Sequence, residues 1–260
     1  VKYSHPEWLG QYLIDCKGYE FTEAFLRCCN SPAPLSIQVN TLKVSAADYA
    51  RALARAELEY ECCDEPVGCI TLQGGSATDL PGFDEGLFYV QDRAARMAVE
   101  IAVPKAGMRV LDACSCPGGK SFAAAIAMGN RGSILACDIH EKKLRLVRDG
   151  AQRLGIDIID VPCSGFGVIA KKPEIRSKTP ESIAELPKIQ GRILDNVSKY
   201  VRPGGVLLYS TCTVTAEENE NTVKAFLERN GEYTAEPFEV CGISTSEGMY
   251  TFWPNVDGTD

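Results

Sequence analysis

The chain has 260 residues, of which 45% are hydrophobic and 24% are charged, a composition typical of a folded soluble protein and unlike that of a disordered or collagen-like chain. Its net charge of -8 argues against a protein that binds nucleic acid through its overall charge. Any nucleic-acid-binding site must therefore be a local one. No apolar stretch reaches the roughly 20 residues of a bilayer span and no secretory signal opens at Val1, so we expect a cytoplasmic protein with no membrane partner.

The first third of the chain predicts two kinds of structure, a long helix and then a small α/β unit. Apolar spacing predicts a helix over Trp8 to Leu26, and alternation predicts a strand over Leu35 to Asn40. Ser45 is a predicted N-cap for a helix that runs to Ala56. A second strand, around Val67 to Leu72, completes the small unit.

After Gly107 the pattern becomes an alternation of strands and helices, which is typical of a parallel sheet with helices on both faces. The expected strands are 109–114, 133–138, 158–161 and 206–210, and the expected helices are 120–128, 142–154, 183–200 and 215–229, the last starting at a capping box of Thr215 and Glu218. We therefore expect an α/β protein with a doubly wound Rossmann-like sheet over residues 91–260, preceded by a small α/β subdomain within residues 1–90.

The first turn of this sheet predicts a ligand site, because a doubly wound sheet binds its ligand where a strand passes into a helix. The turn after Asp112 reads Ala113, Cys114, Ser115, Cys116, Pro117, Gly118, Gly119 and Lys120. Its glycines allow close approach of the backbone, and the helix start favours an anionic group such as a carboxylate. Asp138 ends the next strand 20 positions after Gly118, where a carboxylate accepts hydrogen bonds from ribose hydroxyls.

These residues predict an adenosine-type cofactor. A nicotinamide dinucleotide is disfavoured, because Gly-x-Gly-x-x-Gly is absent and Pro117 and Lys120 stand where a pyrophosphate needs open backbone. The remaining alternative is an ordinary turn followed by a helix cap at Asp138.

Two cysteines each follow a strand-like run, Cys163 in Pro-Cys-Ser-Gly and Cys212 in Thr-Cys-Thr. A thiolate is a strong nucleophile near neutral pH, so two of them meeting in one cleft indicate covalent catalysis. The alternative for each is a small buried hydrophobic residue. The chain has 12 cysteines without the paired spacing of a zinc site, so we expect reduced thiols and no metal.

Together these motifs resemble the Sun/Fmu (RsmB-like) family of S-adenosylmethionine-dependent rRNA cytosine-C5 methyltransferases. Residues 112–120 look like its cofactor motif, Asp-x-Cys-Ala-Ala-Pro-Gly-Gly-Lys. Further matching segments are 35–42, 88–92, 153–155, 162–168, 209–213 and 217–220. The match is to the C-terminal portion of the family, without its helical N-terminal RNA-binding domain. The resemblance implies S-adenosylmethionine as cofactor, held by Cys114 to Lys120, Asp138 and Asp160.

The resemblance also implies a division of labour. Carbon 5 of cytosine is a poor nucleophile, so a thiolate first adds at carbon 6, helped by a carboxyl group beside N3. Cys212 corresponds to the attacking thiol, Cys163 assists product release, Asp160 contacts the cytosine, and Lys120 joins the catalytic set. The target cytosine must be single-stranded or flipped out, because a base inside a helix is out of reach.

The substrate expected from the resemblance is small-subunit ribosomal RNA, with transfer RNA as the alternative within the class. Lys171, Lys172 and Arg176 form a basic stretch suited to phosphates, although a solvated loop has the same pattern. The resemblance also places RNA contacts around Asn40, where Gln38 replaces the usual arginine. A non-catalytic RNA-binding assembly factor and a thiol redox enzyme are the alternatives from other classes.

The sequence departs from the expected sheet after Ile156. Between Asp138 and Asp160 there is room for one helix, whereas a doubly wound sheet carries a further strand and helix there, roughly 20 to 30 residues. We therefore expect a segment to be absent after Ile156. The family carries another carboxylate on that strand, beside the adenosine moiety.

Overall fold

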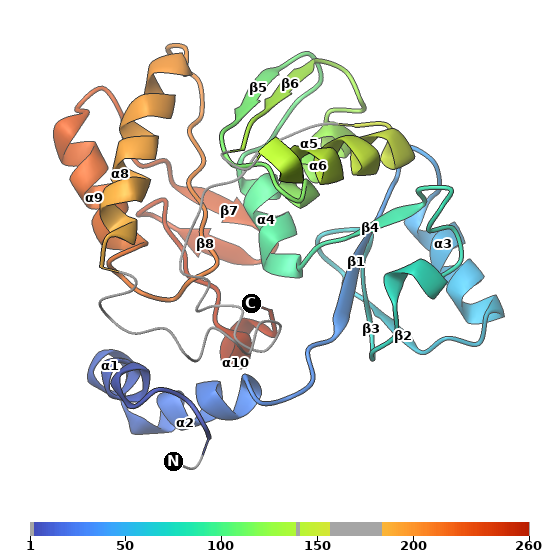
Figure 1. The fold of residues 1–260 in the computed structure, drawn as a ribbon, viewed down its shortest axis with the longest axis horizontal. Helices are drawn as coiled ribbons and strands as arrows, with labels where there is room; N and C mark the ends of the chain where they lie inside the picture. The colour runs from blue at the N-terminus through green and yellow to red at the C-terminus, as the bar shows by residue number, and fades with distance from the viewer. Residues whose placement is uncertain (1–2, 139–140, 157–183, 260) are drawn as a thin grey trace.

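The fold is known from a computed structural model, which describes residues 3–138, 141–156 and 184–259. The chain is an α/β protein, as its sequence predicts, with a four-stranded sheet and, above it in Figure 1, a parallel pair of strands beside two helices. Within the described ranges, no helix is long and apolar enough to cross a membrane.

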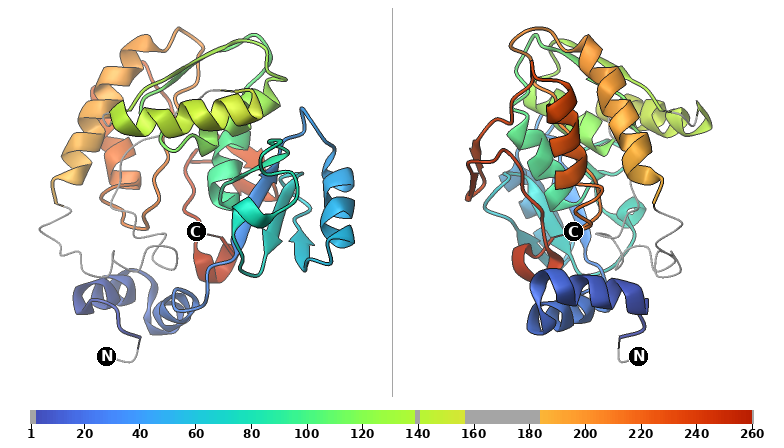
Figure 2. Two further views of the ribbon diagram at one scale, coloured as in Figure 1. Left: turned by 45° about the vertical axis from the view of Figure 1, so that its right-hand side comes forward. Right: turned by 90° about the vertical axis from the view of Figure 1, so that its left-hand side faces the viewer.

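The N-terminal helical segment is two helices rather than the single predicted one. Helices α1 (Glu7–Lys17) and α2 (Tyr19–Cys28) are separated by Gly18, whose φ of 85° lies in the left-handed region that glycine tolerates. Their buried faces pack with Val214 and Trp253 from the C-terminal part of the chain. Figures 1 and 2 show both helices beside the short helix α10 (Pro254–Asp257).

The next unit is an antiparallel sheet of four strands in the order β2-β3-β1-β4. Its elements are β1 (Leu35–Val39), α3 (Ala46–Arg55), β2 (Tyr60–Cys62), β3 (Cys69–Leu72), the 3-10 turn η1 (Ala77–Asp79) and β4 (Phe88–Val90). The predicted cap is confirmed, because Ser45 Oγ accepts a hydrogen bond from Asp48 N at 3.1 Å. Tyr49 and Leu53 of α3 pack against the buried face of this sheet.

The next part of the chain begins with helix α4 (Arg93–Ile101) and continues as an alternation of strands and helices. Its next elements are β5 (Arg109–Asp112), α5 (Gly119–Ala127), β6 (Ser133–Ala136) and α6 (Glu141–Leu154). Strands β5 and β6 pair in parallel, so the predicted strand-helix-strand unit is confirmed.

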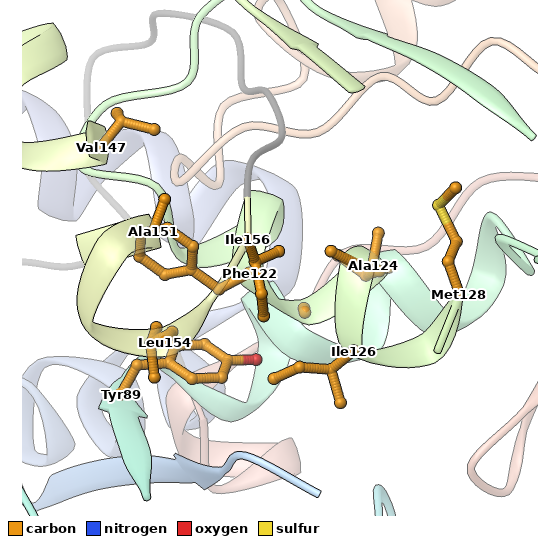
Figure 3. Packing of buried hydrophobic residues seen from close by; sticks show 12 residues of the cluster. Tyr89, Phe122, Ala124, Ile126, Met128, Val147, Ala151, Leu154 and Ile156 are labelled. Carbon is orange, nitrogen blue, oxygen red and sulfur yellow. The ribbon is translucent and has the colours of Figure 1, made fainter. Parts of the chain in front are cut away.

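The core of this part lies between α5, α6 and the edge of β4. Phe122 of α5 packs on Tyr89 with ring centroids 5.7 Å apart, and Ala151 and Leu154 of α6 lie beside the two rings (Figure 3). The same cluster therefore holds the helix that follows the predicted cofactor turn.

The C-terminal quarter differs from the prediction in two places. Its elements are α8 (Leu186–Val197), the 3-10 turn η4 (Ser198–Tyr200), α9 (Glu220–Arg229), the hairpin of β7 (Phe238–Val240) and β8 (Ile243–Thr245), and then α10. The predicted strand over 206–210 is wrong, because no described strand pairs with it. Helix α9 starts at Glu220 rather than Thr215, and the strand predicted over 158–161 lies outside the described residues.

Candidate functional site

The predicted cofactor turn joins β5 to α5 and depends on a buried carboxylate. Asp112 ends β5 with no exposed surface, and its Oδ2 accepts a hydrogen bond from Ser121 Oγ at 2.8 Å. Gly118 has a φ of 113°, and a Cβ at this position would overlap the ring of Phe122. The first turn of α5, which contains the half-buried Lys120, is thus fixed directly behind a turn that requires glycine.

The structure brings Asp138 against this turn, as the spacing predicts. Cys116 N donates a hydrogen bond to Asp138 Oδ2 at 3.1 Å, and Ser115 N donates to Cys137 O at 2.8 Å. Burial, with a further contribution from Asp138, raises the pKa of the Cys116 thiol to about 11, so this cysteine stays neutral near pH 7. The turn therefore presents a carboxylate beside neutral sulfur and backbone amides.

A residue that the sequence analysis did not single out supports the turn from the small sheet. Gln91 is buried, and a Cβ placed on Gly119 would lie 3.2 Å from Gln91 Nε2. The available signal was the position of Gln91 inside segment 88–92, which the family resemblance includes.

Cys212 is an exposed residue in a turn, and one side chain forms hydrogen bonds with both threonines that flank it. Asn219 Nδ2 donates to Thr213 O at 2.8 Å, and Asn219 Oδ1 accepts from Thr211 Oγ1. Since these bonds reach both residues that flank Cys212, the side chain of Asn219 sets the backbone path of the turn. Sequence reasoning included Asn219 only within the matching segment 217–220.

A buried carboxylate lies under the same turn. Glu218 is 1% exposed, and its two oxygens accept hydrogen bonds from Gln190 Nε2 of α8 at 2.9 Å and from Thr215 Oγ1 at 3.2 Å. Tyr209 OH donates to the backbone oxygen of Glu218 at 2.6 Å. A buried ion is stable only when such partners surround it, so the Cys212 turn rests on a rigid polar base.

Helix α1 reaches this base as well. Ala216 N donates to Tyr12 OH at 2.9 Å, and Tyr12 OH donates to Glu217 Oε2 at 3.3 Å. Burial raises the pKa of Tyr12 to about 12, so the phenol remains protonated and can serve both partners.

One predicted RNA contact is contradicted by the structure. Asn40 is 0% exposed, and its Nδ2 donates to Gly86 O at 3.0 Å and to Leu154 O at 3.1 Å. Its side chain joins the small sheet to the end of α6 and cannot face RNA. Five other predicted site residues lie outside the described residues: Asp160, Cys163, Lys171, Lys172 and Arg176. Among the residues that the structure describes, no group of three acidic, cysteine or histidine side chains could hold a metal.

A glycine turn in a parallel strand-helix-strand unit, set against the acidic end of the next strand, is typical of a Rossmann-like α/β protein. The family model described as 16S rRNA methyltransferase RsmB/F matches residues 99–159 and 157–260, and the RsmF/B-like ferredoxin-like domain matches residues 5–79. The chain belongs to the RsmB/F family, which confirms the resemblance to Sun/Fmu proteins.

The curated relatives point the same way. The chain is 33% identical over 255 residues to the probable ribosomal RNA small subunit methyltransferase B of Bacillus subtilis, covering 88% of this chain and 57% of that protein. It is 32% identical over 286 residues to the protein of the same name from Synechocystis sp., covering 98% and 64%. The chain thus spans less than two thirds of the length of these relatives.

A solved structure shares the fold. The structure of NSun6 from Pyrococcus horikoshii, determined with SFG, an S-adenosylmethionine analogue, superimposes with a TM-score of 0.86 at 21% identity, covering 100% of this chain and 97% of that one.

Proposed function

We propose that the chain is the catalytic part of an S-adenosylmethionine-dependent methyltransferase that acts on carbon 5 of a cytosine in small-subunit ribosomal RNA. The observation that carries this proposal is the exposed Cys212, in a member of the RsmB/F family, between two threonines that both form hydrogen bonds with Asn219. The names of the Bacillus and Synechocystis relatives support ribosomal RNA as the substrate.

The residues of the glycine turn fit S-adenosylmethionine. Asp138 lies against the turn, where its carboxylate is suited to ribose hydroxyls, and the amides at the start of α5 suit the carboxylate of the methionine moiety. The lining comprises Cys114, Ser115, Cys116, Pro117, Gly118, Gly119 and Lys120. When bound, this cofactor supplies a methyl group on a sulfonium. The analogue present in the NSun6 structure supports the assignment.

The chemistry then follows from the thiol. Addition of the Cys212 thiolate to carbon 6 moves an electron pair toward carbon 5, which takes the methyl group. Loss of the carbon-5 proton then breaks the carbon-sulfur bond and returns the thiolate. We assign Asp160 to the hydrogen bond at N3 and Cys163 to product release, on the basis of the family motifs.

We also propose that a strand and helix present in relatives are absent after Ile156. The two parts of the family match meet at residues 157–159, and the alignment with the Synechocystis relative runs over 286 residues, more than the 260 of this chain. Leu135 in the middle of β6 is 63% exposed, which suits a strand that has lost a covering neighbour.

Methyl transfer can be tested directly. Purified protein and radiolabelled S-adenosylmethionine are incubated with unmodified 16S rRNA and, separately, with transfer RNA, and modified cytosines are mapped. We expect label at carbon 5 of a cytosine in 16S rRNA. Label in transfer RNA alone would reassign the substrate, and label on another atom would reject the mechanism.

The absent segment favours a second candidate, a non-catalytic RNA-binding assembly factor that keeps the fold. The two functions separate in a Cys212→Ala protein supplied to cells that lack the natural one. Full rescue of ribosome assembly by this variant would support the assembly factor, and loss of rescue would support the enzyme.

A further inference from the structure

Two cysteines of the small sheet face each other at the point where β2 ends. Cys62 pairs with Ile70 at the end of the β2–β3 register, and one residue further Cys63 N donates to Cys69 O at 3.0 Å, while Cys69 N donates to Pro66 O at 3.1 Å. Directly opposite residues of an antiparallel pair have Cα atoms about 4.5 to 5.5 Å apart, which lies within the range of about 4.4 to 6.8 Å that a disulfide spans. The backbone hydrogen bond from Cys63 to Cys69 places the two residues opposite each other in this way.

The surroundings shift the pKa values of the two thiols in opposite directions. A hydrogen bond from Cys69, together with Arg93 and a hydrogen bond from Thr71, lowers the pKa of Cys63 to about 6, although burial and Glu61 oppose this. The same hydrogen bond, burial and the charge on Cys63 raise the pKa of Cys69, so Cys69 keeps its proton and donates it. Near neutral pH the pair is a thiolate beside a thiol, the combination needed for thiol oxidation.

The two cysteines also differ in their exposure to solvent. Cys69 is 1% exposed, whereas Cys63 is only partly buried. An oxidant arriving from solvent therefore meets the thiolate of Cys63 first, and the buried thiol of Cys69 is positioned to react second.

We propose that Cys63 and Cys69 form a redox-active pair that a hydroperoxide converts to a disulfide. The Cys63 thiolate attacks the outer oxygen of the hydroperoxide and becomes a sulfenic acid. The oxygen-oxygen bond breaks, and the remaining alkoxide or hydroxide leaves and is protonated to an alcohol or water. The Cys69 sulfur then attacks the Cys63 sulfur, and the hydroxyl group leaves with the Cys69 proton as water. Two electrons pass from the thiols to the peroxide.

The pair is linked to the proposed cofactor turn by a short run of contacts. Gln38 Nε2 donates to Cys69 Sγ and to Gln91 O, both at 3.2 Å, and Gln91 lies against Gly119. Formation of the disulfide would therefore change the Cys69 sulfur, which accepts the hydrogen bond from Gln38.

The test uses the full chain treated with hydrogen peroxide at pH 7, then blocked with an alkylating reagent. Digestion before Asp64 separates Cys63 from Cys69, so a disulfide-linked peptide pair reports the bond by mass spectrometry. We expect this pair in the wild type and in the adjacent control Cys62→Ser, and its loss in Cys63→Ser. Loss of the linked peptides in Cys62→Ser would overturn the proposal. So would the absence of linked peptides in the wild type at peroxide concentrations that oxidise other cysteines.

Two further measurements do not depend on the disulfide itself. In Cys69→Ser, the sulfenic acid on Cys63 should persist and react with a cyclic 1,3-diketone, and absence of the adduct would count against Cys63 as the attacking sulfur. Without peroxide, iodoacetamide at pH 6.5 should alkylate Cys63 about tenfold or more faster than Cys62, whose pKa is raised by burial. Equal rates would contradict the assigned thiolate.

Discussion

At the scale of single residues, the environment of Cys212 separates its role from that of an ordinary buried cysteine. Its side chain is exposed, and the residues on both sides of it are tied to Asn219. A cysteine kept only for packing would lie in the core, as Cys29 does at 2% exposure.

We expect Cys212→Ser to lower methyl transfer by a factor on the order of 10³ or more, because an alcohol is a far weaker nucleophile at carbon 6. The measurement is incorporation of labelled methyl groups into 16S rRNA under single-turnover conditions. The matched control is Cys16→Ser, because Cys16 is also an exposed cysteine but lies on helix α1. This variant should keep wild-type activity. Unchanged transfer by Cys212→Ser would remove this residue from the mechanism.

The proposed role of Cys163 has a different signature. If it assists release of the methylated base, Cys163→Ser should stall with RNA bound to Cys212, seen as a slowly migrating band on a denaturing gel. The double variant with Cys212→Ser should lose the band. A band that persists in the double variant would place the covalent bond on another residue.

The candidate residues were predictable where local pattern alone determines them. Asp138 was found from its distance along the chain to Gly118, because a parallel strand pair fixes that geometry. Asn40 was wrongly assigned, since its burial depends on Leu154, more than a hundred positions away in sequence. Gln91 was not singled out, and Glu218 was predicted only as part of a capping box, because a polar residue looks alike in sequence whether it is buried or solvated.

At the scale of elements, the Cys212 turn depends on helices from both ends of the chain. Gln190 of α8 binds Glu218, and Tyr12 of α1 accepts from Ala216. The start of α9 was predicted five residues too early. Thr215 and Glu218 do form a hydrogen bond, but both lie in the turn before the helix, where Gln190 of α8 also binds Glu218.

Replacing Glu218 should loosen this base. Glu218→Ala leaves buried partners unsatisfied, which costs about 1–3 kcal/mol, whereas Glu218→Gln keeps the shape and one acceptor and should cost less. Urea denaturation measures the free energy of unfolding, and Glu228→Ala on the exposed face of α9 is the control. Equal losses for Glu218→Ala and Glu228→Ala would show that the buried bonds contribute nothing.

At the scale of the whole molecule, the alternation of strands and helices was predictable up to α6, but the lack of a strand over 206–210 was not. The strand expected over 206–210 needs a neighbour to pair with, and sequence pattern reports the residues of a strand rather than the presence of its partner. The break at Gly18 and the β7–β8 hairpin were missed although both are local features, since Gly18 has a φ of 85° and only Cys241 and Gly242 separate the two hairpin strands.

Restoring the proposed missing segment should stabilise the protein. Insertion after Ile156 of the corresponding strand and helix from the Bacillus relative should cover Leu135, whose full burial is worth about 1.5–3 kcal/mol. We expect the melting temperature to rise by about 5 °C or more. A flexible Gly/Ser insert of equal length is the control, and an equal melting temperature for the two inserts would argue against an absent strand.

The contact between the small-sheet unit and α6 consists of side-chain donors that bind backbone carbonyls. Asn40, Lys43 and Arg153 cross it, and each donates to backbone carbonyls: Lys43 to Glu85 and Arg153, and Arg153 to Phe83 and Phe88. Because a carbonyl is present whatever the side chain, the facing loop is free to drift in sequence while the three donors stay. Chimeras that exchange the N-terminal unit between distant relatives should therefore fold, provided that the donors at these positions are retained.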